Sequence, residues 1–200
     1  MKIDNGIKTN MKKIITRSNI VSIIIVLTMV FLLISPNAKA FLIEGLMKIG
    51  LFQPDISQDN QTPSSPDISF KDEKGQIIVL SSLKGKVAFI NFWATWCPPC
   101  IAEMTSINQL YTQVRTNQNI VIIPVDVDND FTKSVPFMTK NKYILPVYNT
   151  NGEMPEGLLS GAIPTTIIID KSGKIVFRHE GPADYTNKGF TKYLTDLGKR

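Results

Sequence analysis

The chain has 200 residues, of which 43% are apolar, enough for one domain with a buried core. Its formal net charge of +5 comes from residues 1–40, which carry six Lys or Arg and one acid; residues 41–200 carry 16 basic and 16 acidic residues. Because the basic excess is confined to the N-terminus, it gives no argument for binding to nucleic acid, and we predict no nucleic-acid partner.

Residues 1–40 have the pattern of a targeting segment. Basic residues precede an uncharged run at 20–34, and Ala38-Lys39-Ala40 follows as a cleavage-site pattern. The run is shorter than the ~20 residues that a spanning helix needs. We predict a signal peptide that is cleaved after Ala40, with an uncleaved membrane anchor as the alternative. In both cases the basic flank directs the rest of the chain to the periplasm or the outer face of the inner membrane.

Residues 41–65 are predicted to form a short apolar helix followed by a linker. In the segment 41–51, Glu44 and Lys48 lie four positions apart, as in a helical ion pair. This helix can lie on a membrane or pack on the domain, and the sequence does not decide between them. Residues 53–66 are polar with three prolines, which is typical of a linker or surface loop.

Residues 66–200 are predicted to form one α/β domain, in which strands and helices alternate. An unbroken apolar run at 87–92 indicates a strand buried on both faces of a sheet covered by helices. The order of elements predicts a mixed central sheet flanked by helices. The predicted strands are 67–70, 77–80, 87–93, 119–127, 165–170 and 175–179, and the predicted helices are 98–116, 132–141 and 186–197.

Both cysteines of the chain lie at the start of the helix that follows the central strand. Cys97 and Cys100 are three positions apart, on one helix face, where they can close and reopen a disulfide. Unpaired N–H groups and the helix dipole stabilise a thiolate there and lower its pKa from about 8.5. Pro98 and Pro99 fit a first helical turn. We predict that Cys97 attacks a substrate disulfide and that Cys100 resolves the mixed disulfide.

Other roles for the cysteine pair have less support. A zinc site needs two more ligands, and the chain has no further Cys and one His, His179. A structural disulfide with a two-residue loop constrains the unfolded chain very little. We therefore predict no metal and no cofactor other than the redox-active disulfide Cys97–Cys100.

The segment from Phe92 to Cys100, Phe-Trp-Ala-Thr-Trp-Cys-Pro-Pro-Cys, resembles the active site of the thioredoxin fold. It is similar in particular to the exported TlpA/ResA-like thiol–disulfide oxidoreductases, over about residues 66–199. Further matches are Leu83-Lys84-Gly85-Lys86, Glu103 and Gly161-Ala162-Ile163-Pro164-Thr165. The resemblance implies a thioredoxin-like domain with an added N-terminal hairpin and thiol–disulfide exchange activity.

Glu103 lies three residues after Cys100, on the same helix face, where a carboxylate can accept the proton of that thiol. An ordinary solvated helix residue is the alternative. In the family that the chain resembles, the matching Glu assists in this way. Thioredoxins proper have a buried Asp base where this chain has Asn91, which cannot take a proton. This difference favours Glu103 as the base, and we predict a structural amide with satisfied hydrogen bonds at Asn91.

Four further residues are predicted to bind substrate: Trp96, Pro98, Ile163 and Pro164. Trp96 precedes Cys97 and can form an apolar rim, although it could also be a packing residue. The resemblance implies a cis peptide bond before Pro164, placed against the dithiol. The backbone of Ile163 would then face outward, so that a substrate chain can pair with it as an added strand.

The alternating aspartates of residues 126–130 look like part of a calcium loop. The segment lacks the Gly at position six and the Glu at position twelve of such loops. We predict instead a loop at the end of a strand and a helix cap.

Together these features predict an exported reductase of disulfides in envelope proteins. The resemblance implies substrates such as apocytochrome c and a membrane electron donor. A dithiol oxidase of exported proteins is one alternative, because direction depends on the reduction potential. A redox-inert binding module on the same fold is another. A peroxidase has less support, because Cys97 lacks the expected Pro-x-x-x-Thr-x-x-Cys setting.

Overall fold

The computed structural model describes residues 17–56, 66–155, 158–159 and 161–199. The chain divides into two compact units, residues 1–39 and 40–200, which are described separately. Residues 1–16, with the basic residues expected to begin the targeting segment, and most of the predicted linker, 57–65, lie outside the described residues.

The first unit contains α2 (Arg17–Ile34) and the beginning of α3 (Pro36–Lys48). Large apolar side chains of α2 are exposed over its length, from Ile20 at 41% to Ile34 at 73%. Among the described residues, no single helix is long and apolar enough to span a membrane. The helices α2 and α3, which are separated by a bend, reach the required length and apolar content only as a pair.

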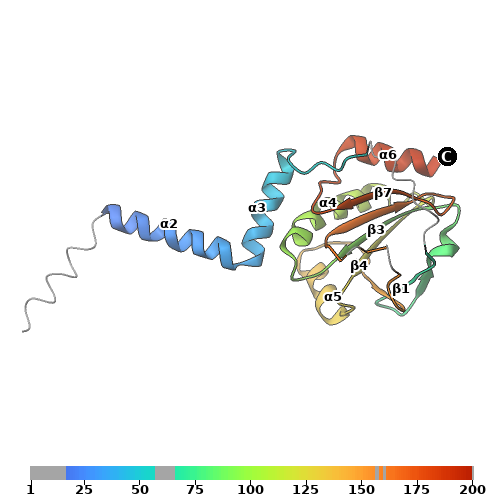
Figure 1. Ribbon diagram of the computed structural model, residues 1–200, viewed down its shortest axis with the longest axis horizontal. Helices are drawn as coiled ribbons and strands as arrows, with labels where there is room; N and C mark the ends of the chain where they lie inside the picture. Colours follow the sequence, from blue (N-terminus) through green and yellow to red (C-terminus); the bar gives the residue numbers. More distant parts are fainter. Residues whose placement is uncertain (1–16, 57–65, 156–157, 160, 200) are drawn as a thin grey trace, which may run out of the picture. The chain divides into compact units, whose positions relative to one another are not determined.

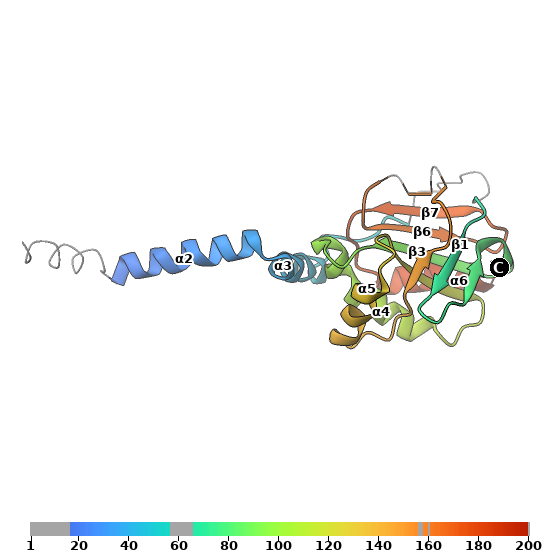
Figure 2. The same cartoon turned by 90° about the horizontal axis from the view of Figure 1, so that it is seen from below.

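The second unit is built on a seven-stranded mixed sheet with the order β2-β1-β5-β4-β3-β6-β7. Its strands lie side by side, with α4, α5 and α6 around them (Figures 1 and 2). β3 pairs in parallel with β4 and antiparallel with β6. The strands are β1 (Ser69–Asp72), β2 (Ile77–Val79), β3 (Val87–Trp93), β4 (Ile120–Asp126), β5 (Tyr148–Thr150), β6 (Thr165–Ile169) and β7 (Ile175–Glu180); the helices are η1 (Leu80–Leu83), α4 (Pro98–Val114), α5 (Phe131–Lys140) and α6 (Lys188–Lys199).

The predicted fold class is confirmed. The antiparallel pair β1 and β2 forms the added N-terminal hairpin, and every residue of β3 is buried, as its apolar run predicts. The sequence prediction missed two short elements, η1 and β5. β5 has three residues, which is too short for a periodic pattern, and its partners β1 and β4 are distant in the sequence.

The core lies on both faces of the sheet because side chains alternate along each strand. Phe89 and Trp93 of β3 face a cluster with apolar residues of α4, α5 and α6. Ile90 and Phe92 face a second cluster with η1 and Leu158. Asn91 lies between Phe89 and Trp93 in this alternation, so its side chain faces α4.

For the segment 41–51, the sequence did not decide between lying on a membrane and packing on the domain. In the structure, one side of this segment packs on the domain. Met47 is 2% exposed and forms a small cluster with Ala40 and Ala102 of α4. The predicted ion pair between Glu44 and Lys48 is present at 3.0 Å.

Candidate active site

The two cysteines lie where β3 ends and α4 begins. Cys97 is the N-cap of α4, and the backbone N–H of Cys100 donates to its Sγ at 3.3 Å. The two residues form a disulfide. Cys97 is 3% exposed and Cys100 is fully buried. On reduction, the N–H groups and dipole of the first turn stabilise negative charge on Cys97.

The segment before β6 lies directly against Cys97. The Ile163–Pro164 peptide bond is cis, which confirms the prediction from the family resemblance. The carbonyl oxygen of Ile163 lies 3.8 Å from Cys97 Sγ. The carbonyl of Pro164 accepts a hydrogen bond from Gly181 at 2.8 Å, which ties this segment to the end of β7. Two of the four residues predicted to bind substrate, Ile163 and Pro164, are thus adjacent to the disulfide.

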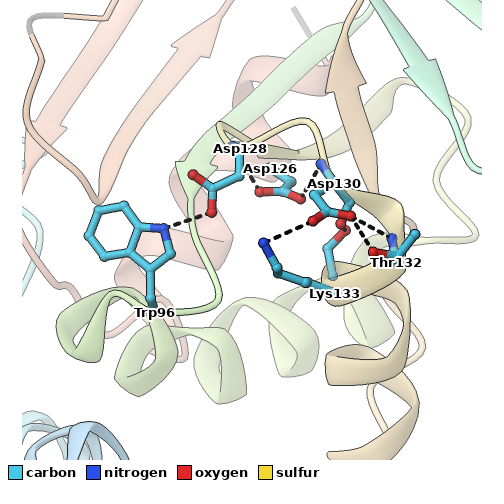
Figure 3. A network of polar contacts seen from close by, with 7 residues as sticks. Trp96, Asp126, Asp128, Asp130, Thr132 and Lys133 are labelled. Carbon is cyan, nitrogen blue, oxygen red and sulfur yellow. Dashed lines mark hydrogen bonds and ion pairs between the residues drawn. The ribbon is translucent and has the colours of Figure 1, made fainter.

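The other two residues predicted to bind substrate flank Cys97 in the sequence. Trp96 is 60% exposed, so it is not a core residue. Its indole Nε1 donates to Asp128 Oδ2 at 2.6 Å (Figure 3). Pro98 is half-buried in the first turn of α4. In contrast, Trp93 is fully buried and packs on Phe137, with ring centroids 5.3 Å apart.

Asp128 belongs to a loop whose polar contacts hold it at the end of β4 (Figure 3). The backbone N–H groups of Asp128 and Asp130 donate to the buried carboxylate of Asp126. Asp130 accepts from the backbone of Thr132 at 3.0 Å and so caps α5. The predicted strand-end loop and helix cap are therefore confirmed. The sequence analysis missed the contact to Trp96, although a signal existed: the carboxyl ends of parallel β3 and β4 meet at one edge, where Trp93 pairs with Asp126.

Glu103 is fully buried, so it is not a solvated helix residue. Its Oε1 accepts a hydrogen bond from Asn91 Nδ2 at 2.7 Å, and its Oε2 accepts one from the backbone N–H of Ala183 at 3.2 Å. Burial raises the pKa of Glu103 to about 8, because the loss of water outweighs the two hydrogen bonds, which lower it. The carboxyl group therefore has a proton affinity close to that of a cysteine thiol.

A chain of buried polar groups extends from Glu103 to β6 and the loop before α6. Asn91 also donates to Thr166 Oγ1 at 3.0 Å, and the hydroxyl of Tyr185 donates to the same oxygen at 2.7 Å. Burial raises the pKa of Tyr185 well above 10, so this residue stays neutral. The sequence analysis missed Thr166 and Tyr185, because only the antiparallel register of β3 and β6 brings Thr166 opposite Asn91.

The prediction that Asn91 is a structural amide with satisfied hydrogen bonds is wrong for one of its two ends. Both hydrogen bonds of the side chain come from Nδ2, and the buried Oδ1 has no partner among the described residues. The amide is therefore aimed as a donor at Glu103, a residue that can hold negative charge.

Residues 60–196 match the family model described as Redoxin. The chain belongs to the redoxin family. This redoxin is 37% identical over 134 residues to the thiol-disulfide oxidoreductase ResA of Bacillus cereus (strain ZK / E33L). These 134 residues make up 66% of this chain and 76% of the relative. A second ResA, from Bacillus cereus (strain ATCC 10987 / NRS 248), is 29% identical over 160 residues, 78% of this chain and 91% of the relative.

Solved structures agree with this assignment. A thiol:disulfide interchange protein of the thioredoxin family from Chlorobium tepidum TLS has a TM-score of 0.56 and 26% identity, covering 70% of this redoxin and 99% of that chain. StoA from Bacillus subtilis, at 23% identity, shares the fold, with a TM-score of 0.53 over 68% of this chain and 98% of its own. The redoxin is a thiol–disulfide oxidoreductase of the ResA-like group, with a Cys97–Cys100 pair.

Proposed function

We propose that this redoxin is an exported reductase of disulfides in envelope proteins, with apocytochrome c as a representative substrate. The observation that carries the proposal is the buried carboxyl group of Glu103 on the helix that begins with the Cys97–Cys100 pair. A dithiol that reduces a partner must lose a proton from its buried thiol at the right moment, and Glu103 can take it. The thiol-disulfide oxidoreductase named ResA, which is 37% identical, supports the reaction class.

The first step forms a mixed disulfide. The thiolate of Cys97 attacks one sulfur of the substrate disulfide, so a bond to Cys97 forms and the substrate bond breaks. The departing substrate sulfur takes a proton from solvent. Cys97 is the attacking residue because it is the N-cap of α4, where the N–H of Cys100 points at its sulfur.

The second step releases the substrate. In molecules whose Glu103 is ionised, a minority below pH 8, Cys100 loses its proton to this carboxylate and attacks the sulfur of Cys97. The bond between Cys97 and the substrate breaks and the enzyme disulfide is restored, and the second substrate sulfur leaves as a thiolate that takes a proton from solvent. Two electrons have then moved from the enzyme to the substrate. Because the pKa of Glu103 is about 8 and that of a thiol is about 8.5, the proton moves between groups of similar affinity. A membrane dithiol donor returns the electrons to Cys97 and Cys100.

Trp96, Pro98, Ile163 and Pro164 form the surface on which the substrate chain docks. The backbone of Ile163 can pair with an extended substrate segment, since its carbonyl lies 3.8 Å from Cys97 Sγ. Trp96 adds an exposed aromatic face beside the same sulfur.

Residues 1–40 export the enzyme, as a signal peptide cleaved after Ala40 or as a retained anchor. This part of the proposal is supported by the exposed apolar side chains of α2 and by the basic residues that precede them in the sequence. The catalytic domain, residues 66–200, then works in the periplasm or at the outer face of the inner membrane. There it meets oxidised protein substrates.

The test is capture of mixed disulfides by a Cys100→Ala variant in intact cells, with Cys97→Ala as the matched control. Cys100→Ala should retain exported proteins, apocytochrome c among them, in a linkage that dithiothreitol releases. Cys97→Ala should retain none. Capture of no exported protein would reject the proposal.

The direction of electron flow needs a second measurement, the reduction potential of the pair. A value near or below about −200 mV supports a reductase, whereas a value near that of strong oxidants, about −120 mV, would assign the dithiol oxidase instead. A redox-inert binding module would be indicated if the Cys97→Ala variant kept the phenotype and the partners of the wild type.

A further inference from the structure

The chamber around Glu103 is closed by the loop that joins β7 to α6. Ala183 donates its N–H to the carboxylate, as described above, and the N–H of Tyr185 donates to Ser106 Oγ at 3.3 Å. Ser106 in turn donates to the backbone carbonyl of Glu103 at 2.8 Å. Both Ala183 and Tyr185 are fully buried. Residues 183–185 therefore separate the carboxyl group from solvent and also supply one of its two hydrogen bonds.

This loop is itself held by a segment more than 130 positions earlier in the sequence. The N–H of Asp184, between the two residues that close the chamber, donates to the carbonyl of Phe52 at 2.9 Å. Asn187 Nδ2 donates to Gln53 Oε1 at 2.6 Å. The loop thus faces Glu103 with one side and residues 52–53 with the other.

The same early segment also packs on α4 next to Glu103. Ala40 and Met47 bury their side chains against Ala102, which directly precedes Glu103. Met47 and Asp184 both line a cavity of about 90 Å³ that reaches Ser106 on α4. The early segment, α4 and the loop therefore meet around the turn of α4 that holds Glu103.

We propose that residues 41–53 are a positioning element of the active site, which presses the 183–185 loop onto α4 and keeps water away from Glu103. The inference rests on the proposed role of Glu103 as the proton acceptor. In the described part of the chain, no hydrogen bond or apolar cluster joins residues 41–53 to Cys97 or Cys100, so the action of this segment passes through Ala102 and the loop. Loss of their packing admits water to the carboxyl group, and water stabilises the charged form.

The charged and titratable groups around this chamber do not change that expectation. Tyr185 on the loop remains neutral, because its pKa is well above 10. On α3, the charge of Glu44 is offset by Lys48 at 3.0 Å. On the loop, Asp184 accepts hydrogen bonds from Thr186. On α4 itself, Cys100 is held in the disulfide when the measurement is made on the oxidised protein.

The experiment uses the full chain in its disulfide form and substitutes Met47→Asn, a neutral polar change that adds no charge beside Glu103, with Ile49→Asn as the matched control. Met47 is 2% exposed, whereas Ile49, two residues later, is 72% exposed. The protonated carboxyl of Glu103 is followed by its infrared carbonyl band from pH 4 to pH 10, identified by its absence in Glu103→Gln. In Met47→Asn the midpoint should fall from about 8 by roughly one pH unit or more, because water then reaches the carboxyl group. Ile49→Asn and the conservative Met47→Leu should titrate like the wild type.

A second readout protects the test against a variant that unfolds. Met47→Ala removes only side-chain volume and should shift the midpoint in the same direction by less. Exchange of the Ala183 amide hydrogen should become faster in both Met47→Asn and Met47→Ala, by about tenfold or more in the asparagine variant. The inference is overturned if a folded Met47→Ala protein keeps both the midpoint and the exchange rate of the wild type.

The same measurements separate this inference from the proposed function. If Met47→Asn shifts the infrared midpoint but the pH profile of disulfide exchange stays where it was, Glu103 is not the proton acceptor, and the positioning effect still stands. If Glu103→Gln removes a limb of that pH profile while both Met47→Asn and Met47→Ala titrate like the wild type, the proposed function stands and the positioning role of residues 41–53 is rejected.

Discussion

Replacing Glu103 by Gln should change how the stability of the oxidised protein depends on pH. The folded state holds the proton of Glu103 up to about pH 8, whereas the unfolded chain releases it near 4.5. Because the folded state binds the extra proton between these values, the free energy of unfolding of the wild type falls as pH rises through this window. The stabilisation is complete below pH 4.5 and is lost above about pH 8.

The size of the effect follows from the two pKa values. They differ by 3.5 units, and each unit corresponds to about 1.36 kcal/mol, which gives about 5 kcal/mol over the whole window. About 4 kcal/mol of this total falls between pH 5 and pH 9. A typical domain has a free energy of unfolding of only about 5–15 kcal/mol, so the loss is easily measured.

The Gln variant removes the titration and keeps the shape of the side chain. Its carbonyl can still accept a hydrogen bond from Asn91, but its amide nitrogen cannot accept one from the N–H of Ala183. This loss should lower the free energy of unfolding by about 1 kcal/mol at every pH. The variant should therefore be slightly less stable than the wild type at pH 5 and more stable by a few kcal/mol at pH 9. Other groups, such as His179, titrate in both proteins and cancel in the difference.

The assay is urea unfolding of both proteins at pH 5, 6, 7, 8 and 9, without reductant. The informative quantity is the difference between their free energies of unfolding, because it isolates residue 103. A difference that stays constant across these pH values, or that changes in the opposite direction, would refute the argument that Glu103 is protonated in the folded protein at neutral pH.

Three further substitutions test other parts of the structure. Asp128→Ala should raise the KM for a protein disulfide by about fivefold, because Trp96 loses a hydrogen bond of about 1 kcal/mol. Asp128→Asn keeps an acceptor for the indole N–H and should have the KM of the wild type. Equal KM values for Asp128→Ala and the wild type in steady-state assays would argue against this contact. Tyr185→Phe removes a buried hydrogen bond to β6 and should lower the free energy of unfolding, measured in urea, by about 1–2 kcal/mol. An unchanged urea midpoint would contradict the hydrogen bond between Tyr185 and Thr166. Phe190→Ala should lower the free energy of unfolding by about 3–5 kcal/mol in the same assay. Phe41 is 79% exposed, and Phe41→Ala should lower it by less than about 0.5 kcal/mol. Similar losses for both variants would show that the core is assigned incorrectly.

The parts of the site that the sequence predicts are those determined by neighbouring residues. The position of Cys97 at the start of α4 follows from an apolar strand, two prolines and a helical pattern that are contiguous in the chain. The burial of β3 follows from its own composition. The cis bond before Pro164 came from family resemblance, since the local sequence carries no separate signal for it.

The burial of Glu103 was not predictable in the same way. Its covering loop lies 80 positions later, and the segment that holds that loop begins about 60 positions earlier. A helical pattern reports which residues share a face, but it does not report what covers that face. For the same reason the apolar residues at 41–51 were compatible with a membrane surface or a protein surface, and only the contact of Met47 with Ala102 decides.

The amide of Asn91 leaves Glu103 as the one carboxyl group in the buried polar chain that it forms with Asn91, Thr166 and Tyr185. An aspartate at this position would put a second carboxylate within 2.7 Å of the first, and two such groups would share protons and ionise in two coupled steps. With an amide as neighbour, Glu103 should ionise in one simple step. The redox state of its sulfur pair can then be matched to a single protonation event.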